Sequence, residues 1–153
     1  MTSYLIDINV WLALSWGQHP HRPAAHKWLS GLSKTSVRLL FCRITQLELL
    51  RLLTNEMVMG QSVFSIEAAL SVYDRWLEDP RVELVAEPQG MEQSFRHATA
   101  GSAKKSATKL IMDGYLAGFA GSERATLVTL DKALSQLGHR AGAATLLIGS
   151  YSA

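Results

Sequence analysis

The acidic residue Asp7 interrupts an apolar run, Leu5 to Leu14, where a predicted buried strand gives way to a loop and a helix. An unpaired buried carboxylate is costly, and a metal ion is its best compensation. Open parallel sheets bind ligands outside the carboxyl ends of their strands, which is where we expect Asp7 to lie. Alternatively, Asp7 and Asn9 cap the following helix, and this stretch alone leaves both interpretations open.

Glu48 lies near the start of a helix that the sequence predicts after the second strand. One interpretation is a capping box, in which Thr45 caps the helix and Glu48, three residues later, bonds back to it. The functional interpretation is that Glu48 points across the strand ends toward Asp7, while Arg51 holds its carboxylate in place. The two roles compete for one side chain.

Asp113 and Asp131 are two further acids at comparable places. Asp113 is expected at the start of a helix whose small residues, Gly114 and Gly118 among them, let it lie close against the sheet. Its alternative role is to complement the helix dipole. Asp131 directly follows a predicted strand. In a parallel α/β sheet all four acids would share one edge, so we expect them to form one pocket.

Four carboxylates in one pocket need a countercharge, because close like charges repel and raise one another's pKa. A divalent cation supplies that charge, and Mg²⁺ is typically bound by a few carboxylates, waters and substrate phosphates. Such an ion activates a water molecule and stabilises the charge that builds on a phosphodiester during displacement. The joint placement of the acids therefore predicts a metal-dependent phosphodiesterase.

Three lysines lie in or just after a small basic loop that precedes Asp113: Lys104, Lys105 and Lys109. A lysine cluster is usually a solvated face of a protein. The functional interpretation is contact with phosphates, because lysines beside a carboxylate metal site would attract a polyanion such as RNA. Both interpretations stay open.

The elements that position these residues are short apolar strands alternating with helices. This pattern predicts a parallel sheet covered on both faces, in one domain spanning residues 1–153 without a linker or repeat. Residues 57–60 are expected to break the helical pattern. The strands are expected at about 4–6, 37–42, 82–85, 126–130 and 145–148, and the helices at about 9–15, 24–32, 45–53, 65–77, 91–100, 113–120 and 132–137.

Composition narrows the class of protein further. A hydrophobic content of 48% with 18% charged residues fits a compact fold, and a net charge of +2 permits a nucleic-acid partner without demanding one. The single cysteine, Cys42, excludes an internal disulfide and is expected to be a small buried residue. His19 and His21 are expected in a solvated loop. The chain has neither a signal-peptide pattern nor a membrane-spanning run, so we expect a cytoplasmic protein.

Taken together, these motifs resemble the PIN domain, and more closely the VapC-type ribonuclease toxins of type II toxin–antitoxin systems. The resemblance runs from about Tyr4 to Leu147. It implies a three-layer α/β/α Rossmann-like fold with a central, mainly parallel sheet. The motifs that carry it are Leu5-Ile6-Asp7-Ile8-Asn9, Thr45-x-x-Glu48-x-x-Arg51, Asp113 with Tyr115-Leu116-Ala117, and Thr129-Leu130-Asp131.

The resemblance also implies a function, namely RNA cleavage that depends on Mg²⁺ or Mn²⁺. It further implies a cognate antitoxin as partner, in a homodimer or a toxin–antitoxin hetero-oligomer. The chain departs from many relatives at Ile8 and Gly114, but neither change removes an acid. By the resemblance, the catalytic and metal-binding residues are Asp7, Glu48, Asp113 and Asp131, with Asn9, Thr129 and Arg51 as supporting polar residues.

Two other hypotheses compete with a metal-dependent ribonuclease. A catalytically silent PIN-fold module would bind a partner protein, but it has no obvious need for four acids along one edge. An Asp-dependent phosphatase would use Asp7 as its nucleophile. Such enzymes generally open with Asp-x-Asp, and position 9 here is Asn.

Overall fold

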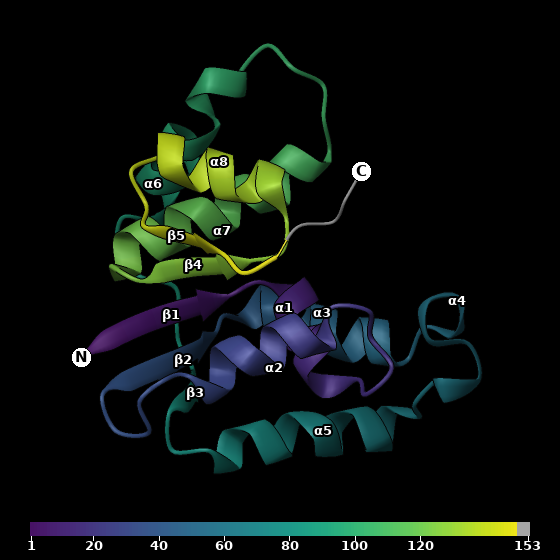
Figure 1. Cartoon of the computed structure of the whole chain (residues 1–153). Helices are drawn as coiled ribbons and strands as arrows, with labels where there is room; N and C mark the ends of the chain where they lie inside the picture. Colours follow the sequence, from purple (N-terminus) through teal and green to yellow (C-terminus); the bar gives the residue numbers. More distant parts are fainter. Residues whose placement is uncertain (150–153) are drawn as a thin grey trace.

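The computed structural model describes residues 1–149 and shows a five-stranded parallel sheet between two layers of helices (Figure 1). The strand order is β3-β2-β1-β4-β5, with every neighbouring pair parallel. The predicted three-layer α/β/α fold is thus confirmed. The strands are β1 (Thr2–Ile6), β2 (Val37–Phe41), β3 (Val82–Leu84), β4 (Thr126–Thr129) and β5 (Thr145–Leu147).

The strands bury both faces because successive side chains point to opposite sides of the sheet. One face, including Ile6, Phe41 and Val128, packs under α1 (Ile8–Ser15), α2 (Arg22–Ser30), α3 (Arg43–Leu53) and α5 (Ile66–Glu78). The other face, including Leu5, Leu40 and Leu127, packs against α6 (Met91–Thr99), α7 (Lys109–Glu123) and α8 (Lys132–Arg140). Figure 1 shows these two layers below and above the sheet.

Aromatic side chains fix the helices of the first layer. The Trp11 ring stacks on Phe41, with ring centroids 3.8 Å apart, and Phe41 meets Tyr73 edge-on at 5.2 Å. Trp76 donates a hydrogen bond from Nε1 to Ser15 Oγ at 2.8 Å. These contacts join α1 and α5 to the end of β2, so the first turn of α1 is held rigidly at the carboxyl edge of the sheet.

Glycines set the approach of α6 to α7. A Cβ atom at Gly118 would lie 2.9 Å from Phe95 N, and one at Gly114 would lie 2.4 Å from Thr99 Cγ2. The prediction that small residues let this helix pack closely was therefore right in effect, but the partner at these two positions is α6 and not the sheet. The close packing fixes the segment of α7 that carries Asp113.

Other segments differ from the predicted elements. Residues 57–60 were expected to interrupt the helical pattern, but a short helix, α4 (Glu56–Met59), forms there and continues into η1 (Gly60–Ser62). Asn55 explains this helix, since its side chain accepts a hydrogen bond from Met57 N at 2.9 Å. A second 3-10 turn, η2 (Ala100–Ser102), follows α6. Among residues 1–149, every helix is too short or too polar to cross a bilayer.

Candidate active site

Asp7 follows β1 directly, and its side chain is buried, with 4% of the residue exposed. Oδ1 accepts a hydrogen bond from Ile8 N at 2.7 Å, and Oδ2 accepts one from Thr129 Oγ1 at 2.8 Å. Asp7 therefore does cap α1, whereas Asn9 lies inside the helix and does not cap it. Burial raises the pKa of Asp7 to about 6; the two hydrogen bonds oppose this rise and the charges of Asp113 and Asp131 add to it.

Thr129 connects the ends of β1 and β4. Its fully buried hydroxyl donates to Asp7 and accepts a hydrogen bond from Asp131 N at 2.9 Å. Asp131 in turn caps α8, because Oδ1 accepts from Ala133 N at 2.9 Å and from Leu134 N at 3.3 Å. These bonds fix the directions of both carboxylates relative to the sheet.

Lys109 lies between two of the predicted acids. Its Nζ is 3.5 Å from Asp113 Oδ2 and forms a hydrogen-bonded ion pair with Asp131 Oδ2. This arrangement arises because α7 begins at Lys109, four residues earlier than predicted, so that Asp113 lies in the second turn and not the first. The spacing of i and i+4 then places the lysine and Asp113 on one side of the helix.

The pKa values of the two carboxylates beside Lys109 are shifted in opposite directions. Burial raises the pKa of Asp113, and the ammonium of Lys109 only partly offsets this. Burial also acts to raise the pKa of Asp131, but the bonds from Lys109 and from the backbone of α8 outweigh it, and the net pKa is lowered. The site therefore holds one well-stabilised carboxylate and two, Asp7 and Asp113, that lack sufficient countercharge.

Glu48 lies outside this group of interactions. Its carboxylate accepts two hydrogen bonds from Arg51, from Nε at 3.1 Å and from Nη2 at 2.8 Å. The predicted capping-box role for Glu48 was wrong, because α3 begins at Arg43 and its capping box joins Cys42 and Thr45. Glu48 therefore does not cap α3, and its described partner is Arg51.

The four predicted acids do not form one cluster. Within residues 1–149, no three Asp, Glu, His or Cys side chains stand close enough together to hold a metal ion. The ammonium of Lys109 lies between Asp113 and Asp131, and Glu48 pairs with Arg51 on the same helix.

The chemistry of these side chains nevertheless suits a divalent cation. Carboxylate oxygens are the ligands that Mg²⁺ and Mn²⁺ prefer. The contacts of Lys109 show that the place between Asp113 and Asp131 accepts a positive charge. The raised pKa of Asp7 is the expected behaviour of a buried carboxylate that lacks a nearby cation.

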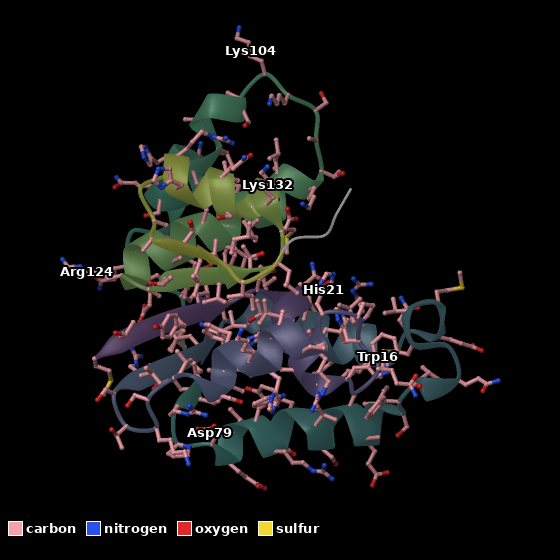
Figure 2. The ribbon with its side chains drawn as sticks, in the orientation of Figure 1. Trp16, His21, Asp79, Lys104, Arg124 and Lys132 are labelled. Carbon is pink, nitrogen blue, oxygen red and sulfur yellow. The ribbon has the colours of Figure 1, made fainter. Side chains whose placement is uncertain are left out.

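Two of the predicted lysines lie on a solvated surface, which was one of the two interpretations, whereas His19 is not in the solvated position expected for it. Lys104 and Lys105 are exposed on the loop after η2, and Figure 2 shows Lys104 at the tip of that loop, pointing away from the sheet. His19 is buried and not solvated; its Nδ1 accepts a hydrogen bond from His21 N at 3.0 Å, and burial lowers its pKa. The signal for this burial was Trp16, whose ring packs edge-on against His19.

Comparison with known proteins assigns the family. The PIN-domain model matches residues 4–140, so the chain belongs to the PIN-domain family. Ribonuclease VapC41 from Mycobacterium tuberculosis (strain H37Rv) is 41% identical over 139 residues, covering 88% of this chain and 92% of that protein. The chain is therefore a homologue of the VapC ribonuclease toxins, as the sequence motifs predicted.

Solved structures share the fold at low sequence identity. VapBC-1 from nontypeable Haemophilus influenzae superposes with a TM-score of 0.67 at 16% identity, covering 96% of this chain and 98% of that one. VapBC2 from Rickettsia felis, bound to a DNA fragment from its promoter, has a TM-score of 0.66 at 17% identity, covering 95% of this chain and 98% of that one. FitAcB from Neisseria gonorrhoeae has a TM-score of 0.61 at 20% identity, covering 94% of this chain and 96% of that one. These matches confirm the PIN fold.

Proposed function

We propose that this chain is an endoribonuclease that depends on Mg²⁺ or Mn²⁺ and acts as the toxin of a toxin–antitoxin pair. The observation that carries the proposal is the network at the strand ends, in which the Thr129 hydroxyl links Asp7 to Asp131 and Lys109 contacts both Asp131 and Asp113. The 41% identity to ribonuclease VapC41 supports RNA as the substrate. A bound cation would supply Lewis-acid stabilisation and a water of lowered pKa.

The chain's own residues would orient the ligands. Thr129 and the backbone of α1 each bond one oxygen of Asp7, which fixes its carboxylate before any cation arrives. Asp131 has Oδ1 engaged by α8 and offers Oδ2, the oxygen that now contacts Lys109. Asp113 likewise offers Oδ2. We place these three acids as the principal ligands and as the catalytic centre.

Glu48 and the basic residues have outer roles in this proposal. Glu48 is the fourth ligand and Arg51 its positioning residue, with Asn9 as a further polar residue in the first turn of α1. In the metal-bound enzyme the ammonium of Lys109 would contact an RNA phosphate, together with Lys104 and Lys105, in place of the acids. The proposed RNA surface has three exposed lysines: Lys104, Lys105 and Lys109.

An antitoxin protein is the proposed partner. The solved relatives are VapBC and FitAB assemblies, which supports a two-component system here. Exposed apolar side chains on α3 to α5 would be covered in such a complex or in a homodimer: Leu47, Met57, Ile66 and Leu70. We propose one PIN domain over residues 1–153, of which the last four lie outside the described residues.

One observation favours the catalytically silent alternative. Lys109 already neutralises Asp131 and part of Asp113, as a structural ion pair would in a domain that binds no metal. The two hypotheses differ in what a cation does to the protein, because only the nuclease must exchange the ammonium for a metal ion.

A cleavage assay tests the proposed function. Purified protein is incubated with a structured RNA pool and Mg²⁺ or Mn²⁺, with EDTA as one control. The Asp7→Asn variant should be inactive, whereas the Asp74→Asn variant, altered at an exposed residue of α5, should keep full activity. Equal inactivity of wild-type protein and both variants across diverse RNAs would favour the silent module. Cleavage that survives Asp7→Asn would contradict the proposed site.

A further inference from the structure

The carboxyl edge of the sheet continues past the acids into a cavity of about 430 Å³. Four of the residues that line it come from three segments. Arg43 is the second residue after β2, Val85 and Glu87 follow β3, and Tyr115 belongs to α7. The strand order is β3-β2-β1-β4, so the cavity at the ends of β2 and β3 is next to the end of β1, which precedes Asp7, and two strands away from the end of β4, which precedes Asp131. Neighbouring strands are about 5 Å apart, which puts the cavity roughly one to two strand spacings from Asp7.

Aromatic and apolar side chains form part of the cavity wall. The rings of Tyr115 and Phe119 lie 5.9 Å apart at an angle of 49°, and Leu84 and Val85 lie beside them. Flat aromatic rings stack favourably on nucleobases, at about 1–3 kcal/mol per base. Phe119 is buried, so the half-buried Tyr115 is the ring available to the face of a base.

Polar groups of opposite charge complete the wall. Tyr115 donates a hydrogen bond from its hydroxyl to Glu87 Oε1 at 2.9 Å, which holds the carboxylate at the cavity. Burial and the neighbouring Glu87 raise the pKa of Tyr115, so the phenol stays a proton donor. Arg43, the first residue of α3, also lines the cavity; its Nη1 donates a hydrogen bond to Gln46 Oε1 at 2.7 Å, and its other guanidinium nitrogens carry further N–H donors. A carboxylate in the wall disfavours a phosphate group and favours a ligand with N–H donors.

We infer that this cavity binds one unpaired guanine base of the RNA, next to the phosphodiester that is cleaved at the acids. This inference rests on the proposed function. Guanine presents two adjacent donors, N1–H and the N2 amino group, which match the two oxygens of Glu87. Its O6 and N7 acceptors match the guanidinium of Arg43. Unpaired bases are commonly recognised in this way, by aromatic stacking and hydrogen bonds to the base edge.

The other bases match this wall less well. Adenine places its N1 acceptor beside its amino group, so one carboxylate oxygen would face a lone pair. Uracil offers one N–H between two carbonyl oxygens, and cytosine offers donors only on its amino group. Each would leave part of the Glu87 carboxylate without a donor, which costs binding energy when the group is desolvated.

Binding of short RNAs in EDTA tests the inference without any cleavage. Fluorescence anisotropy is measured for four labelled pentanucleotides, UUGUU, UUAUU, UUCUU and UUUUU. We expect UUGUU to bind about tenfold more tightly than the others. Glu87→Gln should abolish this preference, whereas Glu92→Gln, the same change at an exposed residue of α6, should preserve it.

The outcomes separate this inference from the proposed function. Equal affinity for the four RNAs, no measurable binding of any, or a guanine preference that survives Glu87→Gln would overturn the guanine site. RNA cleavage with Mn²⁺ alongside equal affinities would leave the nuclease standing and remove only the guanine site. A guanine preference that depends on Glu87, in a protein that cleaves no RNA, would support the guanine site and count against the nuclease.

Discussion

Two parts of the carboxyl edge hold their acids in different ways. At the ends of β1 and β4, Asp7 and Asp131 are joined through the buried Thr129 hydroxyl and bonded to the backbone of the helices that follow. On α3, Glu48 is held only by the partly exposed side chain of Arg51. The first arrangement is set by the sheet itself, while the second depends on two flexible side chains. We therefore expect the first to govern catalysis and the second to adjust it.

The sharpest test of this difference compares Asp7→Asn with Glu48→Gln. Asp7→Asn removes a charge that the sheet holds in place, and we expect RNA cleavage to fall about 1000-fold, more than the 10- to 100-fold typical of outer residues. Glu48→Gln should cost only about tenfold. Initial rates at saturating Mn²⁺ measure both. Equal losses in the two variants would remove the distinction between the two parts of the edge.

The raised pKa of Asp7 predicts a pH dependence of stability. A carboxyl whose folded pKa is about 6, above its ordinary value of 3.8, favours the folded state below the ordinary value and loses that contribution as pH rises to the folded pKa. The wild-type protein in EDTA should therefore lose about 3 kcal/mol, relative to Asp7→Asn, between about pH 3 and pH 7. Urea unfolding of both proteins across this range measures the difference, and parallel curves would contradict it.

The link between the strands is tested by Thr129→Val. This change keeps the shape of the side chain but leaves Asp7 Oδ2 without its donor, so we expect a loss of about 1–3 kcal/mol in the free energy of unfolding. Cleavage should fall about 10- to 100-fold because the carboxylate loses its orientation. Thr126→Val, at the start of the same strand, is the control. Unchanged activity in Thr129→Val would show that the hydroxyl does not position Asp7.

The smallest expected effect belongs to Arg51→Met. The Arg51–Glu48 pair is partly exposed, and such pairs contribute only about 0–1 kcal/mol to stability. We expect little change in the unfolding midpoint and a severalfold rise in the Mn²⁺ concentration needed for half-maximal cleavage. A loss of activity as large as that of Asp7→Asn would mean that α3 is as important as the strand ends.

Local patterns in the sequence were sufficient for some of these features. The apolar run broken by Asp7, and the strand that ends just before Asp131, predicted both acids at the sheet edge, and the alternation of strands and helices predicted the fold. The start of α3 was misplaced because Cys42, a weak capping residue, precedes the stronger candidate Thr45. The start of α7 was missed because Thr108 makes no side-chain cap.

Tertiary contacts decided the rest. The pairing of Lys109 with Asp131 joins residues 22 positions apart and depends on where α7 meets α8. The cavity between Arg43 and Tyr115 is built from three separate segments. None of these arrangements follows from local spacing alone.

Calorimetric titration with Mn²⁺ tests most directly whether the acids form a cation site. We predict that wild-type protein binds Mn²⁺ and that Asp113→Asn weakens binding at least about tenfold. Lys109→Met, which removes the competing ammonium, should tighten it, and Asp74→Asn should leave it unchanged. Absence of Mn²⁺ binding by the wild-type protein, or the same affinity in all four proteins, would contradict the account.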